Sequence, residues 1–182
     1  EKLFSERMCR HFYEDYGLET RVVRYHNIYG PFGTYDGGRE KAPAALCRKI
    51  IQAKVNKKET IDVWGDGEQT RSFLYINDCI EGTMKVFESK KFDVYNVGSA
   101  EQVSINQMID MIEDIANYKV KRNYQLDKPK GVRGRSSNNE KITKDIGWSP
   151  KIKLKDGLEK TYKWIFDSIT SGDNTSKFTR TY

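Results

Sequence analysis

The stretch that most constrains the fold of this chain spans residues 24–49 and reads RYHNIYGPFGTYDGGREKAPAALCRK. It begins as a strand, turns at a Gly-Pro pair, passes through a loop with three further glycines, and enters a helix near Ala42-Pro43. Glycine permits backbone conformations that other residues avoid, and it lets a chain pass close to a ligand. The loop also carries Arg39, Glu40 and Lys41, so it is either a solvated surface loop or a segment well placed for chemistry.

Short strand patterns and amphipathic helix patterns alternate along the rest of the chain. Val22 and Val23 stand side by side in the first strand pattern, which suits a strand buried on both faces of a parallel sheet. We therefore predict an α/β fold with a parallel sheet. The predicted helices cover residues 1–16, 42–54, 77–88, 136–147 and 154–169, with another that begins at Ser104, and the predicted strands cover residues 21–28, 61–64, 71–76, 94–97 and 120–126.

Two of these helices carry specific signals for how they begin and how they pack. A Ser-x-x-Gln capping box starts the helix at residue 104. Asn77 is expected to cap the helix over residues 77–88, in which Ile80, Met84 and Phe87 recur at the spacing of a core-facing stripe. We assign these apolar residues to the core and give them no chemical role.

The composition predicts a cytoplasmic protein without a metal site or a membrane span. Hydrophobic residues make up 37% of the 182 residues, and the mean hydropathy is −0.78, so no window suggests a transmembrane helix. Cys9, Cys47 and Cys79 are scattered and lack metal-ligand spacing, which fits a reducing compartment better than a disulfide framework. The N-terminal residues resemble no signal peptide, and a helix already under way at residue 1 leads us to expect a chain that begins inside a domain.

The net charge of +6 does not by itself identify a partner. It arises from 32 basic and 26 acidic residues, which are interspersed rather than gathered in one block. Scattered charge of this kind argues against nucleic-acid binding. A few convergent arginines would instead suit the diphosphate of a nucleotide ligand.

Several segments resemble the extended short-chain dehydrogenase/reductase superfamily, and within it the GDP-mannose 3,5-epimerase family. They run in family order: residues 24–49, WGDGEQTRSF at 64–73, YNVGS at 95–99, GVRGR at 131–135 and DIGWSP at 145–150. YNVGS and DIGWSP are widespread in the superfamily, whereas GGREKAPAA and GVRGR are more specific to the epimerases. The resemblance implies that residues 1–40 end a Rossmann-type NAD-binding domain. It also implies that residues 41–182 form mainly the smaller α/β substrate-binding domain, with some elements returning to the Rossmann sheet.

The resemblance also implies roles for individual residues. Lys2 would be the lysine of the Tyr-x-x-x-Lys signature, catalytic and cofactor-binding, with the tyrosine preceding Glu1. Lys41 would be one member of an acid/base pair whose partner is a cysteine that none of the three cysteines here matches. The residues implied to bind substrate are Asn27, Glu40, Ala42, Lys49, Gln69, Thr70, Arg71 and Arg135. Without the resemblance, Asn27 reads equally well as a turn residue, and the lysines read as surface residues.

The activity that the resemblance implies is the NAD-dependent conversion of GDP-mannose to GDP-L-galactose or GDP-L-gulose by a homodimer. A 4-keto intermediate would make the hydrogens on C3 and C5 acidic, and the acid/base pair would invert those carbons. The first helix would lie in a helix-bundle dimer interface.

Two features keep alternatives open. The chain contains no G-x-x-G-x-x-G or G-x-G-x-x-G after a strand, where the superfamily binds NAD. A nucleotide-sugar 4,6-dehydratase or 4-epimerase shares the more widespread segments, and a non-catalytic nucleotide-sugar-binding fragment would also fit. The Ser-, Thr- and Asn-rich tail after Ser168 is compatible with a loose end or with a segment that returns over the site.

Overall fold

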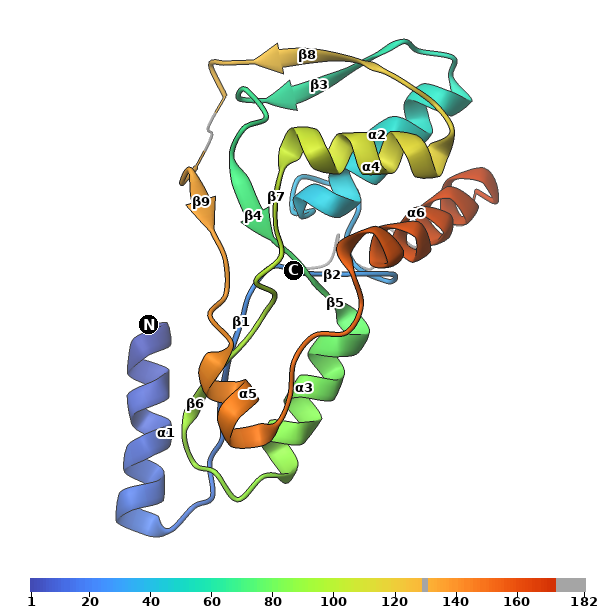
Figure 1. Cartoon of the computed structure of the whole chain (residues 1–182). Helices are drawn as coiled ribbons and strands as arrows, with labels where there is room; N and C mark the ends of the chain where they lie inside the picture. The colour runs from blue at the N-terminus through green and yellow to red at the C-terminus, as the bar shows by residue number, and fades with distance from the viewer. Residues whose placement is uncertain (129–130, 173–182) are drawn as a thin grey trace.

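The computed structural model describes residues 1–128 and 131–172, and it has two regions (Figure 1). The predicted tail lies largely outside the described residues. We call the first region the sheet region. It is built on a parallel pair, β1 (Val22–Tyr25) and β6 (Val94–Val97), with the helices α1 (Lys2–Tyr16), α3 (Ile76–Glu88) and α5 (Glu140–Ile146) around it.

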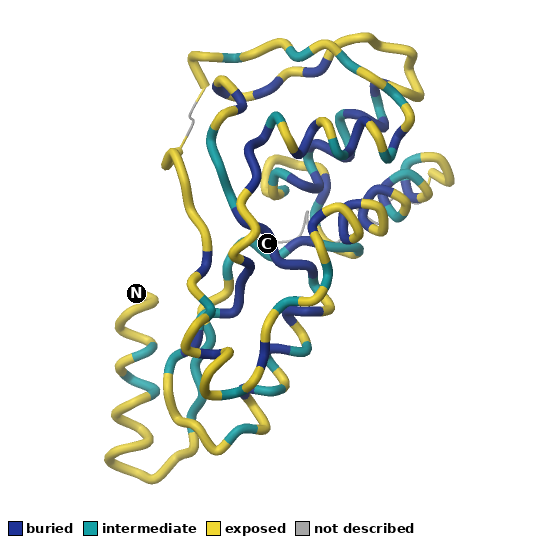
Figure 2. The backbone as a smooth tube through the Cα atoms, in the orientation of Figure 1, coloured by how far each residue is buried: buried dark blue, intermediate teal, exposed yellow. Residues whose placement is uncertain are grey.

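The second region, which we call the cavity region, contains a second parallel pair and three helices. Strand β3 (Thr60–Trp64) pairs with β8 (Lys121–Gln125), and α2 (Ala42–Val55) packs against α4 (Ile105–Ala116) and α6 (Leu154–Thr170). The alternation in β3 turns Ile61 and Val63 into the core and leaves the residues between them exposed. Most of the buried apolar side chains of the described chain lie in this region (Figure 2).

Short strands join the two regions. Strand β2 (Ile28–Tyr29) pairs in parallel with β5 (Leu74–Tyr75). Strand β4 (Thr70–Ser72) pairs antiparallel with β7 (Gln102–Ser104) and parallel with β9 (Gly134–Arg135). These two short sheets, one of two strands and one of three, connect the sheet region to the cavity region.

Most predicted elements are present, and the capping box at Ser104 is confirmed. The Ser104 hydroxyl accepts a hydrogen bond from the backbone N–H of Gln107, and the Gln107 side chain accepts one from the backbone N–H of Ser104. The strand predicted over 21–28 divides into β1 and β2, because Asn27 adopts a left-handed conformation with φ of 44° between them. The helix predicted over 136–147 is shorter, since α5 begins at Glu140.

Two predictions for α3 are wrong. The helix begins at Ile76 directly after β5, so its N-cap is Tyr75, and Asn77 lies within the first turn without capping it. The apolar stripe predicted for the core is exposed, with exposed fractions of 55% for Ile80, 46% for Met84 and 65% for Phe87.

A different face of α3 meets the core because of a close helix contact. A Cβ built on Gly82 would lie 2.7 Å from Cε2 of Trp148, so this glycine admits the fully buried indole. Cys79 and Val86 flank Gly82 on the same buried face. The stripe of Ile80 therefore points away from the sheet.

Strand β1 also differs from its prediction. Val22 and Val23 are half-buried rather than buried, because β1 pairs only with β6 among the described residues and α1 contributes no buried residue. Among the described residues, no helix is long and apolar enough to cross a membrane, and no group of three or more His, Cys, Asp or Glu side chains is arranged to hold a metal ion.

Candidate active site

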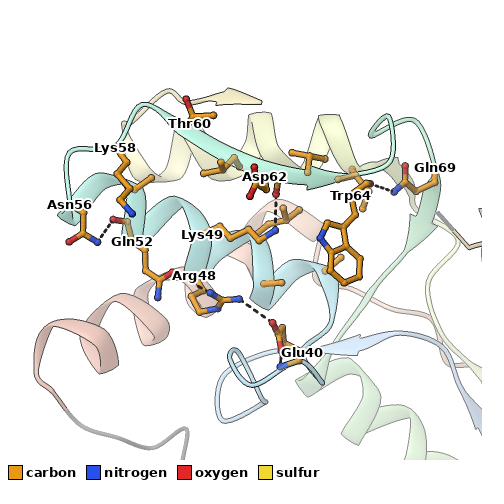
Figure 3. Close-up of a pocket in the computed structure, with 18 residues that line it drawn as sticks. Glu40, Arg48, Lys49, Gln52, Asn56, Lys58, Thr60, Asp62, Trp64 and Gln69 are labelled. Carbon is orange, nitrogen blue, oxygen red and sulfur yellow. Dashed lines mark hydrogen bonds and ion pairs between the residues drawn. The ribbon is translucent and has the colours of Figure 1, made fainter. Parts of the chain in front are cut away.

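A cavity of about 850 Å³ opens between α2 and the neighbouring edge of β3 (Figure 3). Four of the residues predicted to bind substrate line it: Glu40, Ala42, Lys49 and Gln69. They come from the glycine-rich loop, from α2 and from the turn after β3, so the fold gathers residues that are up to 29 positions apart in the sequence, from 40 to 69. A cavity of this size is in the range of small-molecule sites.

Side chains that line the cavity bind the backbone of β3. Lys49 Nζ donates to the carbonyl oxygen of Asp62 at 2.7 Å, and Gln69 Nε2 donates to the carbonyl oxygen of Trp64 at 3.1 Å. Burial lowers the pKa of Lys49, and the neighbouring Arg48 lowers it further. Gln69 Oε1 is buried without a hydrogen-bond partner among the described residues, so it can accept a hydrogen bond from a ligand.

Trp64 is a cavity residue that the sequence analysis missed. Its side chain lines the cavity while remaining 56% exposed, at the end of β3 next to a glycine turn. An exposed indole at a cavity is suited to stacking against a flat ring. The signal that could have identified it is the strand alternation, which places Trp64 opposite the buried Val63.

The glycine-rich loop before α2 is held in place by one arginine. Arg48 Nε donates to the carbonyl oxygen of Tyr35 at 2.8 Å, and its terminal nitrogen donates to Glu40 Oε1 at 3.1 Å. The other Glu40 oxygen accepts the backbone N–H of Gly38 at 2.7 Å, and the Glu40 side chain is only 11% exposed. The Glu40 carboxylate, predicted to bind substrate, is thus engaged within the protein.

Lys41 is exposed, whereas the side chain of its chain neighbour Glu40 is largely buried. Lys41 is the N-cap residue of α2, and its carbonyl oxygen accepts the first helical hydrogen bond from Ala45 at 3.0 Å. Its side chain makes no hydrogen bond or ion pair with the described residues. The ammonium group is therefore accessible to a ligand.

The predicted arginines lie side by side on adjacent strands. Arg71 of β4 and Arg135 of β9 are partners in the parallel register, and the backbone N–H of Thr70 donates to the carbonyl oxygen of Arg133 at 2.9 Å. A Cβ built on Gly131 would lie 3.3 Å from a terminal nitrogen of Arg71. The basic loop thus passes close to Arg71, and β4 and β9 carry arginines at paired positions, which suits an anionic ligand.

Asn27 and His26 lie where β1 ends. Asn27 Nδ2 donates to the carbonyl oxygen of Ser72 at 3.0 Å, next to Arg71 on β4. Burial and the positive charge of Arg135 lower the pKa of His26. His26 was not predicted, because a histidine within a strand pattern carries no signal of its own.

Lys2 is not brought into the cavity. It lies exposed in the first turn of α1, whose N-terminus is at the same end of the sheet region as the carboxyl ends of β1 and β6 (Figure 1). Ligands of open α/β sheets bind at that end. The structure therefore brings together the cavity residues and, separately, the arginine pair with Asn27, and it leaves Lys2 at the sheet.

Comparison with known families decides which family this arrangement represents. The family model described as GDP-mannose 4,6 dehydratase matches residues 1–161. The chain belongs to the GDP-mannose 4,6-dehydratase family. This membership and the α/β architecture confirm the resemblance and the fold class predicted from the sequence.

Members of this family and their structural relatives differ in activity. GDP-mannose 3,5-epimerase from Arabidopsis thaliana is 46% identical over 169 residues, which are 93% of this chain and 44% of that protein. Among solved structures, UDP-glucose 4-epimerase from Thermotoga maritima with UDP-glucose matches with a TM-score of 0.83 and 27% identity, over 92% of this chain and 52% of that one. UDP-glucuronic acid 4-epimerase from Bacillus cereus in complex with UDP-glucuronic acid and NAD matches with a TM-score of 0.72 and 32% identity, over 90% of this chain and 50% of that one. The chain thus spans about half the length of the relatives that it matches.

Proposed function

We propose that this chain is the substrate-binding part of an NAD-dependent nucleotide-sugar epimerase, and that its substrate is GDP-mannose. The observation that carries the proposal is the exposed Lys41, which lies in the chain between Glu40 and Ala42, two residues that line the cavity together with Lys49 and Gln69. The identity of 46% to a GDP-mannose 3,5-epimerase supports this choice of substrate and reaction.

The proposed ligand contacts follow from the charges of the site. Arg71 and Arg135 would bind the diphosphate, because a guanidinium fork suits phosphate oxygens better than an ammonium does. Lys49, Gln69 and the exposed ring of Trp64 would hold the nucleoside end of the ligand along the cavity. Thr70, Asn27, Glu40 and Ala42 would complete the binding site, with Glu40 acting through its bond to the loop backbone.

Lys41 would act as one member of the acid/base pair that inverts the sugar carbons. A lysine on a fixed loop can remove a proton from a sugar carbon when its amine is neutral, and as an ammonium it can donate a proton to one face of the carbanion that such a removal creates. Its partner on the opposite face would come from outside these residues. Such a positioned group contributes about 10²–10⁴-fold to the rate.

The described residues fit NAD only in part. Lys2 lies at the end of the sheet where nucleotide cofactors bind, but the sequence has no glycine fingerprint for the pyrophosphate. When bound, NAD would accept the C4 hydride of the sugar and return it. Within this chain, Lys2 would contribute to the cofactor site, and residues 1–40 would end the NAD-binding domain.

The surface of α1 supports a further part of the proposal, a homodimer. Leu3, Phe4 and Tyr16 are exposed by 63%, 68% and 77%, and the helix has no buried residue. Apolar side chains on one helix are suited to a helix-bundle contact with a second copy. We place this dimer in the cytoplasm.

A 4-epimerase is the second candidate, because the two solved structures described above are 4-epimerases. The test is to supply the native protein that contains this chain with NAD, and separately with GDP-mannose, UDP-glucose and UDP-glucuronic acid. The proposal predicts new GDP-hexose isomers of unchanged mass when the reaction runs in water, and deuterium at the inverted carbons when it runs in deuterium oxide. Inversion of a UDP-sugar at C4 alone would establish the 4-epimerase, loss of water would establish a dehydratase, and binding without conversion would establish a non-catalytic protein.

A further inference from the structure

We infer that Arg48 is a positioning residue for the proposed acid/base chemistry, because it fixes the loop that delivers Lys41. This inference rests on the proposed function. Arg48 lies on α2, two turns after Lys41, and it was not singled out in the sequence because it reads as an ordinary helix residue. Its side chain is only 16% exposed and turns back over the loop (Figure 3).

The contacts of Arg48 span the second half of the loop, from Tyr35 to Glu40. At the start of this half, Nε bonds the Tyr35 carbonyl oxygen at 2.8 Å and lies 3.6 Å from Asp36 Oδ1. At its end, a terminal nitrogen bonds Glu40 Oε1 at 3.1 Å. The remaining terminal nitrogen bonds Gln52 Oε1 at 3.2 Å, one turn further along α2. One guanidinium group thus joins both ends of this half of the loop to the helix.

The loop needs this clamp because its own backbone is permissive. Gly37 and Gly38 have φ of 98° and 86°, in the left-handed region that glycine adopts readily. Glu40 closes the loop by accepting the Gly38 N–H, but it does so with a carboxylate that Arg48 holds in place. Without Arg48, two loop groups lose their partners, and two adjacent glycines leave the backbone free to rearrange.

The consequence for Lys41 follows from its position in the chain. Lys41 comes directly after Glu40, and its side chain has no partner of its own among the described residues, so only its backbone sets where the ammonium group can reach. The α2 backbone fixes Lys41 on one side, and the Arg48–Glu40 pair fixes it on the other. Misplacing a catalytic group by about 1 Å can cost about 10²-fold in rate.

A lysine could not replace this arginine fully. The bonds to Tyr35 and Glu40 use different nitrogens of one planar fork, whereas an ammonium is a single point on a flexible stem. Arg48→Lys therefore keeps the charge but loses the geometry. Arg48→Gln loses both.

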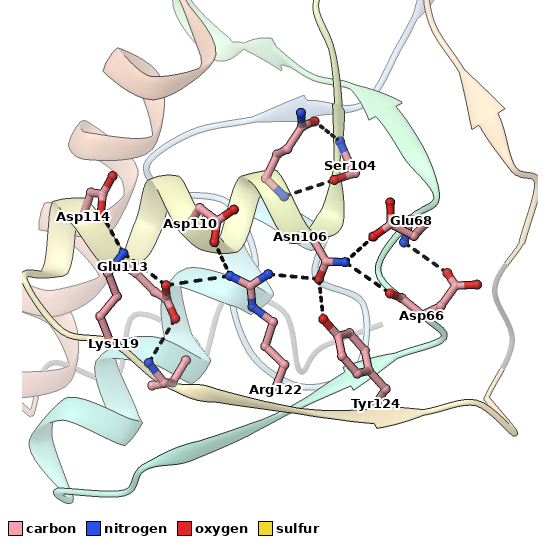
Figure 4. A network of polar contacts seen from close by, with 12 residues as sticks. Asp66, Glu68, Ser104, Asn106, Asp110, Glu113, Asp114, Lys119, Arg122 and Tyr124 are labelled. Carbon is pink, nitrogen blue, oxygen red and sulfur yellow. Dashed lines mark hydrogen bonds and ion pairs between the residues drawn. The ribbon is translucent and has the colours of Figure 1, made fainter.

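Arg122 provides a matched control. Its side chain is 19% exposed, and it joins β8 to α4 through Asp110 and Glu113, away from the loop (Figure 4). Arg122→Gln removes a half-buried arginine with carboxylate partners, as Arg48→Gln does. A general loss of stability would affect both variants alike.

The test compares two rates in the native protein with NAD and GDP-mannose: C4 oxidation, followed as NADH absorbance, and inversion, followed by deuterium at C3 and C5. Arg48→Gln should lower inversion by roughly 10–100-fold relative to oxidation, and Arg48→Lys should recover part of this loss. Arg122→Gln should leave the ratio of the two rates unchanged. An unchanged ratio in Arg48→Gln, or an equal change in both Gln variants, would overturn the inference. If Arg48→Gln does not fold, an unchanged ratio in Arg48→Lys has the same meaning.

A second readout separates this inference from the proposed function. Hydrogen exchange at the loop amides of residues 36–41, above all the Gly38 N–H, should speed up in Arg48→Gln and not in Arg122→Gln. If the wild-type protein converts no nucleotide-sugar, the proposed function fails while this exchange still tests the clamp. Exchange that is unchanged in Arg48→Gln would show that Arg48 does not hold the loop.

Discussion

The sheet region and the cavity region use similar sequence patterns but differ in how they bury them. In the cavity region, Met108, Ile109 and Ile112 of α4 are fully buried, as the helical period predicts. In the sheet region, Ile80 and Phe87 of α3 recur with a comparable period and remain exposed. The difference teaches that a periodic apolar stripe identifies a helix, whereas its burial depends on a neighbouring element (Figure 2).

The causes of the pKa shifts also differ between the two regions, again because burial differs. On α1, the pKa of Glu6 is lowered by its hydrogen bond to Arg24, and that of Glu14 by its hydrogen bond to Arg10. In the cavity region, the largest cause that lowers the pKa of Lys49 is burial. Paired surface charges are typical of a solvated helix, whereas a desolvated cation beside a cavity is typical of a binding site.

The largest expected effect is a difference in stability between two isoleucines. Ile112→Ala should lower the free energy of unfolding by about 2–5 kcal/mol, because it leaves a cavity at a fully buried position. Ile80→Ala should change it by less than about 0.5 kcal/mol, because the side chain is largely in solvent. Urea unfolding measures both. A comparable loss for Ile80→Ala would break the comparison and would mean that another part of the native protein covers α3.

A smaller effect is expected at the close contact between Gly82 of α3 and the Trp148 ring in the sheet region. Gly82→Ala should destabilise the protein by about 1–3 kcal/mol through overpacking against Trp148, although alanine in a helix is otherwise favoured by about 1 kcal/mol. Asn77→Ala, at an exposed position of the same helix, serves as the control in thermal unfolding. Equal or increased stability in Gly82→Ala would show that α3 can move away from the indole.

The smallest expected effect concerns pH and Lys49. The Lys49 ammonium is charged below its pKa, and that pKa is lowered from 10.5. The attraction of Lys49 for the phosphates of GDP should therefore weaken as the pH rises through this lowered pKa toward 10.5. The loss should be at most about tenfold, or about 1.4 kcal/mol. Calorimetry on wild type and on Lys49→Met measures it. The same decline in Lys49→Met would assign the pH dependence to another group.

Local sequence signals were enough to predict the helices and most of the strands. The capping box at Ser104 and the apolar period of α6 depend only on nearby residues, so both could be found. Strands β7 and β9 could not be predicted in this way. They have only three and two residues, and they become strands only by pairing with β4. Segment 71–76 divides for the same reason, since β4 and β5 have different partners.

The site could be predicted only where a motif carried it. The family segments led to the prediction of Lys49, Gln69 and Arg135. The structure adds that Lys49 and Gln69 line one cavity and that Arg135 pairs with Arg71. Arg48 was missed because its partners, 8 and 13 residues away at Glu40 and Tyr35, are set by a loop conformation that no periodicity encodes. Trp64 was missed although the alternation of β3 marks its face, and His26 was missed because its charge environment depends on the packed structure.

The central claim is that Lys41 is half of an acid/base pair that inverts a nucleotide-sugar. The most direct measurement is made on Lys41→Ala in the native protein, with NAD and GDP-mannose in deuterium oxide. The account predicts that NADH still forms, because the C4 oxidation machinery is intact, and that inversion falls by about 10²–10⁴-fold. Inversion of C5 at the wild-type rate, with normal deuterium incorporation, would contradict the claim and reduce Lys41 to a surface or binding residue.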